Sequence, residues 1–206
     1  MNDYPIRLPW VGSRYEESRV LIMGESHYCA LSDEFFIDLT LCTIEDARKE
    51  ALGTSFFSNI KDSVLGNMSN KESSDDFWER FAFANFCQGA VIRENGKSLS
   101  RASPQMFKAG EQALPTILSL LKPRKVILLS KNAWKHTRNL PCITSHAAEP
   151  SIFCSDGKEA EIYFYASEPL GFAVSCIAIC HPSSWRWSGQ NANYWHFAIR
   201  NFLDRP

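Results

Sequence analysis

The sequence contains no apolar run of the length needed to cross a membrane, and it does not begin with a secretory signal. Charge of one sign is not in excess either, since the sequence has 22 Lys and Arg and 23 Asp and Glu, which give a formal net charge of -1. We therefore expect a monomer of the cytoplasm that does not bind membranes. Any contact with DNA would depend on a local basic patch.

Cysteine is present seven times, but its spacing excludes the common metal sites. No Cys-x-x-Cys pair occurs, and the scattered positions match neither a zinc site nor an iron–sulfur quartet. The closest pair, Cys176 and Cys180, lies in an apolar strand, where both side chains face the same side and suit a core. An odd number of thiols also fits a reducing compartment. We expect no metal and no cofactor.

The length of 206 residues suits one domain with a substantial core, and we expect residues 1–206 to form a single domain. Residues 1–18 contain Pro5, Pro9 and Gly12, which predict an irregular lead-in before the first strand. The polar stretches 67–76 and 94–104 predict surface loops.

Apolar runs and helical patterns alternate along the rest of the chain. The runs at 20–23, 126–129 and 173–180 are typical of strands that are buried on both faces, as in a parallel sheet. Further strands are predicted within 77–88, ending at Asn85, and at 161–166. Helices are predicted at 33–39, 43–52, 56–65, 104–121, after Ser130 and at 191–203. This alternation predicts a three-layer α/β/α sandwich around a mostly parallel sheet of four to five strands. The strands beginning near Val20 and Val174 should be central.

Polar side chains follow three of the predicted strands, at the point where each strand ends. They lie in the stretches Gly24–Tyr28, Asn85–Gln88 and His181–Trp187. Because ligands of open α/β sheets bind beyond the carboxyl ends of the strands, we expect the three stretches to meet in one crevice.

These stretches resemble the motifs of the uracil-DNA glycosylase superfamily. Gly24-Glu25-Ser26-His27-Tyr28 stands where its members have a first motif led by Gly, Asn85 corresponds to their base-reading Asn, and His181-Pro182-Ser183 matches their His-Pro-Ser motif. The resemblance covers roughly residues 18 to 203. It implies the fold of that superfamily, DNA as the partner, and hydrolysis of the N-glycosidic bond of a flipped-out base without a cofactor.

The resemblance implies a role for each candidate residue. Asn85 would hold the Watson–Crick edge of a pyrimidine, and a neutral His181 would donate a hydrogen bond to the base oxygen on which negative charge develops. Phe35 or Phe36 would stack on the base, with Phe36 as the first candidate, and Tyr28 would screen the substituent at C5. His27 would complete the substrate-binding residues.

Two positions depart from the best-known members of the superfamily. Ser26 stands where they have a water-activating Asp, so Glu25 becomes the candidate for activating the water and stabilising the cationic sugar, with Ser26 orienting that water. Where they insert a Leu wedge into the duplex, this chain has aromatic and basic side chains. DNA contacts are therefore expected from Ser183, Ser184, Trp185, Arg186 and Trp187.

Other interpretations remain open at this point. The strand-Gly-Glu-x-His pattern also resembles hydrolases of the erythromycin-esterase type, in which Glu25 and His27 would act with another His; the candidates are His136, His146 and His196. The same fold could instead serve as a non-catalytic nucleic-acid-binding module that docks through residues 185–187. For a glycosylase, the base stays open: uracil, a deaminated purine, or a modified pyrimidine such as those in some phage DNA. The last would mean an antiviral rather than a repair role.

Overall fold

A computed structural model describes the following parts of the chain. They are residues 4–29, 37–52, 55–94, 97–98, 101–137, 140, 144–146, 152–153, 159–160, 162–167, 171–182 and 190–205.

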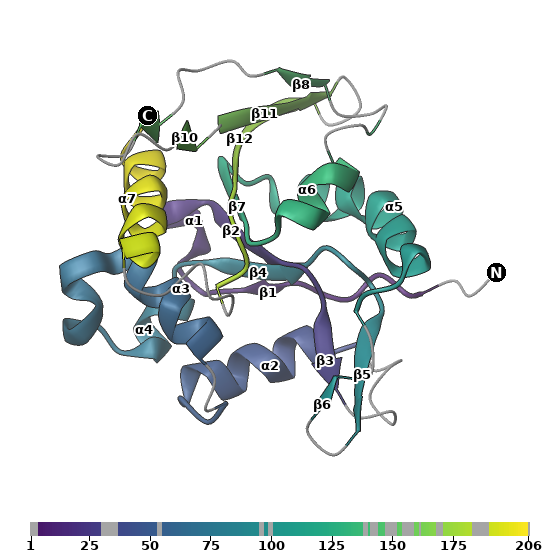
Figure 1. The fold of residues 1–206 in the computed structure, drawn as a ribbon, viewed down its shortest axis with the longest axis horizontal. Helices are drawn as coiled ribbons and strands as arrows, with labels where there is room; N and C mark the ends of the chain where they lie inside the picture. Colours follow the sequence, from purple (N-terminus) through teal and green to yellow (C-terminus); the bar gives the residue numbers. More distant parts are fainter. Residues whose placement is uncertain are drawn as a thin grey trace.

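A seven-stranded sheet runs through the middle of the molecule (Figure 1). Its strands, in spatial order, are β1 (Trp10–Val11), β4 (Ala82–Asn85), β2 (Val20–Gly24), β7 (Lys125–Leu128), β12 (Phe172–Ala178), β11 (Ile162–Ser167) and β8 (Thr144–His146). The four strands β4, β2, β7 and β12 are mutually parallel, whereas β1, β11 and β8 pair antiparallel. The predicted parallel core and the internal positions of β2 and β12 are confirmed. The sheet is wider than predicted because antiparallel strands extend both of its ends.

Helices cover both faces of this sheet because the buried strand residues point alternately to either side. Leu21 and Met23 pack into the cluster formed with α1 (Tyr15–Ser18), α5 (Pro104–Leu121) and α6 (Lys131–Thr137). Val20 and Ile22 pack on the opposite side, in the cluster formed with α2 (Leu39–Arg48), α3 (Ser55–Leu65), α4 (Ser74–Trp78) and α7 (Gln190–Asp204). The three layers that the sequence predicted are therefore present (Figure 1).

Helix α5 forms where the sequence predicts it. Pro104 occupies its first turn, and the Ser103 hydroxyl caps the helix by accepting a hydrogen bond from the backbone N–H of Met106 at 3.3 Å. Proline inside a helix removes one backbone hydrogen bond, but α5 continues past Pro115 without a break to Leu121. The buried stripe of α5 is its side that faces the sheet.

Smaller elements complete the described chain. A second sheet, formed by β3 (His27–Cys29), β5 (Ala90–Glu94) and β6 (Lys97–Ser98), extends beside α2 (Figure 1). Strands β9 (Ile152–Phe153) and β10 (Glu159–Ala160) pair with each other, and a 3-10 helix, η2, spans Gly66–Lys71. No helix in the described part of the chain has the length and apolar character of a membrane span.

The N-terminal lead-in is more regular than the sequence predicted. Trp10 and Val11 pair with Phe83 and Ala82 of β4, and one helical turn, α1, follows. Between them, a Cβ at Gly12 would overlap backbone carbonyls at the end of α4, so only glycine lets the strand approach that closely. Tertiary contacts with β4, rather than local propensity, order this segment.

Two boundaries in the helical layer were predicted wrongly. The helix expected to begin with Thr43 begins at Leu39, because the Thr43 hydroxyl donates to the carbonyl of Leu39 at 2.7 Å instead of capping a new helix. The strand expected over 77–88 is helical at Phe77 and Trp78, which end α4, and strand pairing starts only at Ala82. The predicted loops likewise contain η2, the start of α4, and β6.

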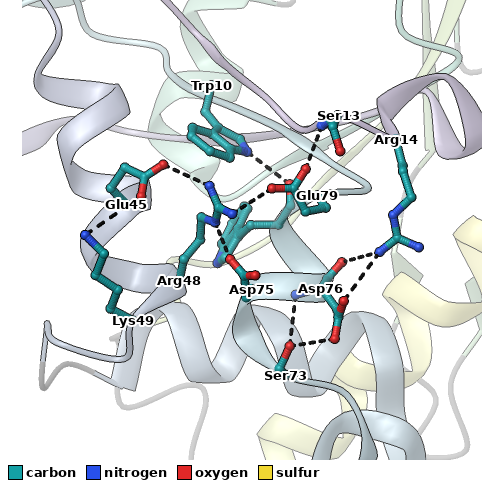
Figure 2. Close-up of polar contacts among 11 residues, drawn as sticks. Trp10, Ser13, Arg14, Glu45, Arg48, Lys49, Ser73, Asp75, Asp76 and Glu79 are labelled. Carbon is teal, nitrogen blue, oxygen red and sulfur yellow. Dashed lines mark hydrogen bonds and ion pairs between the residues drawn. The ribbon is translucent and has the colours of Figure 1, made fainter.

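An ion-pair network joins α2 and α4 to the lead-in (Figure 2). The Arg48 guanidinium contacts three carboxylates, those of Glu45 at 2.8 Å, Asp75 at 2.6 Å and Glu79 at 2.7 Å. It also lies 5.0 Å from the centre of the Trp10 ring. This planar cation therefore links α2 to the end of α4 and, through Trp10 of β1, to the edge of the sheet.

Candidate functional site

The strand order places a topological switch point between β2 and β7. Counting only the parallel strands in chain order, they are arranged as second, first, third and fourth, from β4 through β2 and β7 to β12. The chain therefore leaves β2 and β7 toward opposite sides of the sheet. A crevice at the carboxyl ends of these two strands is the usual ligand site of such a sheet.

Glu25 occupies this point directly after β2. Its backbone carbonyl accepts a hydrogen bond from Cys87 at 2.8 Å, and the carbonyl of Gly24 accepts one from Phe86 at 2.9 Å. These bonds clamp the turn to the end of β4. The half-buried Glu25 carboxylate then accepts a hydrogen bond from the hydroxyl of Ser130, which comes shortly after β7.

Ser130 is a site residue that the sequence analysis missed. It is only 2% exposed, and it caps α6, because its oxygen accepts hydrogen bonds from the backbone N–H groups of Asn132 at 3.1 Å and Ala133 at 3.0 Å. The signal that could have found it was present: a polar residue directly after an apolar strand and directly before a helix.

His181 reaches the same edge of the sheet from the end of β12. Its ring stacks at a tilt on Phe56 of α3, with 4.9 Å between the ring centres, and Asn59 of α3 donates to the carbonyl of Pro182 at 2.9 Å. Burial lowers the pKa of His181, and the nearby negative charge of Glu25 opposes that shift in part. His181 is therefore mostly neutral at pH 7, and a neutral imidazole carries one N–H donor.

The charge of Glu25 also acts on Cys87. Burial, and then the Glu25 charge, raise the pKa of the Cys87 thiol. Cys87 therefore stays protonated at neutral pH and does not supply a thiolate nucleophile beside the site.

Asn85 ends β4 and stands opposite Gly24 in the parallel pairing of β4 with β2. Its side chain is 7% exposed, and its Oδ1 atom occupies the space that a Cβ on Gly24 would need. Asn85 therefore depends on glycine at position 24, and its amide lies over the backbone immediately before Glu25. The strand ends thus bring Asn85, Glu25 and His181 to one edge.

Gly24→Ala is expected to destabilise the protein by about 1–3 kcal/mol, because the new methyl group overlaps Asn85 and lies 3.3 Å from the Phe83 ring. Urea unfolding measures this loss. In an Asn85→Ala background the same change should cost clearly less, since the overlapping amide is gone. An equal cost in both backgrounds would mean that Asn85 is not what the methyl group meets.

The remaining residues of the first motif lie less favourably for contact with a substrate. The Ser26 hydroxyl donates to the carbonyl of His27 at 3.1 Å. His27 is 5% exposed, and its Nε2 shares a hydrogen bond of 2.8 Å with the Thr40 hydroxyl of α2. Tyr28 is 38% exposed on β3, where it pairs with Val91. The placement of His27 suits packing of β3 against α2 better than substrate binding.

His27 should make the protein sensitive to acid. Burial, assisted by the charge of Arg7, lowers the pKa of His27 to about 3, whereas the unfolded chain titrates near 6.5. Both states are neutral at pH 7, and below pH 6.5 only the unfolded state gains a proton, so stability falls by at most about 1.4 kcal/mol per pH unit. His27→Gln should flatten this loss in urea unfolding measured between pH 7 and 4.5. Equal slopes in both proteins would contradict a buried neutral ring.

Some predicted site residues lie outside the described residues. These are Phe35 and Phe36, and the DNA-contacting set Ser183, Ser184, Trp185, Arg186 and Trp187. Their predicted roles stay predictions.

Two of the histidines that were candidates for the hydrolase site, His136 and His196, interact with other residues in the structure. His136 binds Glu111 at 2.7 Å and stacks on Phe107, with ring centres 4.4 Å apart, between α5 and α6. His196 of α7 interacts electrostatically with Arg200 and Asp62, and burial is the main cause that lowers its pKa. None of these contacts involves Glu25, whose charge acts instead on His181. Within the described ranges, no three His, Cys, Asp or Glu side chains gather to hold a metal ion.

No family model matches this chain, and no curated protein matches it.

A pocket of about 380 Å³ lies elsewhere, in the helical layer formed by α2, α3, η2 and α4. Phe57 and Trp78 contribute apolar groups to its lining, and Lys61 and Glu50 contribute charged groups. None of its lining residues belongs to a strand end. We place the candidate site at the sheet edge instead, because there the polar groups from three strands and Ser130 converge at a switch point.

Proposed function

We propose that this chain is a DNA glycosylase, which flips out a base and hydrolyses its N-glycosidic bond to leave an abasic site. The observation that carries the proposal is the meeting of Asn85, Glu25 and His181 at the carboxyl ends of parallel strands. A uracil-DNA glycosylase-like form of the three-layer fold is part of the proposal.

The three side chains offer the groups that the reaction needs. The Glu25 carboxylate can take a proton from the attacking water, and its negative charge stabilises the cationic sugar that forms as the bond breaks. A neutral His181 can donate a hydrogen bond to the departing base, which leaves as an anion. The Asn85 amide offers both a donor and an acceptor to the edge of the base.

The proposal is tested by incubating the purified protein with a panel of DNAs and scoring abasic sites. The panel contains single- and double-stranded DNA with uracil, deaminated purines and modified pyrimidines, and it includes genomic DNA from phages that carry modified bases. Abasic sites in one member of the panel, absent with Glu25→Gln, support the proposal. DNA binding without abasic sites on any member would instead indicate the non-catalytic binding module.

A further inference from the structure

Ser130 has one hydroxyl proton, and its hydrogen bonds show which acceptor receives that proton. The Ser130 oxygen accepts hydrogen bonds from the backbone N–H groups of Asn132 and Ala133, which act only as donors. A serine oxygen has two lone pairs, so both are occupied. The remaining proton is therefore the one donated to Oε2 of Glu25.

We propose that Ser130 is a positioning residue, which uses this proton to hold the Glu25 carboxylate in one orientation. Oε2 is engaged, and no hydrogen bond from the described residues reaches Oε1, which can therefore bind a ligand or a water. Among the described residues, Ser130 is the side chain with which the Glu25 carboxylate forms a hydrogen bond. The role of Ser130 in turnover rests on the proposed glycosylase function.

Ser130 does not act as the nucleophile itself. Its side chain is 2% exposed, its lone pairs accept from the first turn of α6, and its proton is committed to Glu25. Because one hydroxyl both caps α6 and holds Glu25, the first turn of α6 and the carboxylate are mechanically coupled. A loss of Ser130 frees both at once.

The first experiment measures this coupling without any substrate. Thermal unfolding midpoints are compared for the wild type, Ser130→Ala, Glu25→Ala and the double variant. If Ser130 donates to Glu25, the midpoint shift caused by Ser130→Ala is clearly smaller in the Glu25→Ala background than in the wild type. Equal shifts in both backgrounds overturn the proposal, whatever the panel of DNAs shows.

The second experiment uses the DNA that the panel identifies. Ser130→Ala should lower kcat by about 10²-fold with little change in KM, because a carboxylate out of place loses its alignment with the water. Ser130→Thr, which keeps a hydroxyl, should restore most of the turnover. In a Glu25→Gln background, Ser130→Ala should change the residual kcat by less than about twofold, since groups that act as a unit are not additive.

Ser103→Ala is the matched control, since it removes the hydroxyl that caps another helix, α5. It should lower the unfolding midpoint and leave kcat unchanged. If Ser130→Ala lowers kcat by the same factor in the wild type and in the Glu25→Gln background, Ser130 serves only as a helix cap. That result would overturn the positioning role. If no DNA in the panel is cleaved but the midpoints are non-additive, the glycosylase function fails and the Ser130–Glu25 coupling stands.

Discussion

Glu25→Gln is expected to fold and to bind DNA like the wild type, and to lose about 10²- to 10⁴-fold of base excision on the substrate that the panel identifies. The amide has the shape of the carboxylate, and its oxygen can still accept the Ser130 proton. It cannot take a proton from water, and it brings no negative charge to the cationic sugar. Single-turnover release of the base measures the effect, with DNA affinity measured in parallel.

Glu111→Gln provides the control for removing a carboxylate elsewhere. Glu111 is partly exposed and pairs with His136 in the layer of α5 and α6. Its substitution should leave base excision unchanged. Near-wild-type excision by Glu25→Gln would show that another group holds the water, and Ser26 would then be the next residue to test.

His181→Ala is expected to lower kcat by about 10²- to 10³-fold while DNA affinity changes little. The reason is that the variant loses one preorganised donor to the departing base. The alanine also removes a ring that packs on Phe56, so His181→Asn, which keeps a donor, is measured beside it. The readouts are single-turnover excision and DNA binding.

The pH dependence separates the two possible forms of His181. Because burial lowers the pKa of His181 below its usual value near 6.5, the neutral ring predominates from pH 7 to 8, and its contribution to excision should be nearly constant there. A requirement for the charged ring would instead make excision fall as the pH rises through this range. His196→Ala, on α7 where the ring interacts with the charges of Arg200 and Asp62, should leave excision intact and controls for the loss of an imidazole.

Local sequence patterns predicted much of the fold. Runs of apolar residues predict strands buried on both faces, and β2, β7 and β12 formed where such runs stand. Pro104 and a stripe at helical spacing predict α5. The same logic predicted that polar residues after separate strands would share one edge, because parallel strands all end on the same side of a sheet.

Short apolar stretches were predicted less well. Phe77 and Trp78 are as apolar as a buried strand, yet they end a helix that Ser73 caps by accepting from the N–H of Asp76 at 3.0 Å. A run of a few apolar residues suits either state, so the choice depends on what packs against it. Thr43 shows the same limit, since its hydroxyl can cap a helix or bond back within one.

The sequence by itself determined the parallel core, the layers that cover it, and the strand ends at which Asn85, Glu25 and His181 stand. Only the tertiary structure decided which neighbours those residues meet. In the folded protein His27 is buried against Thr40, and the Ser130 hydroxyl donates to Glu25. The physical reason is that the order of strands in a sheet, and so the contacts between residues some hundred positions apart, depend on how helices pack across both faces. No local pattern encodes that packing.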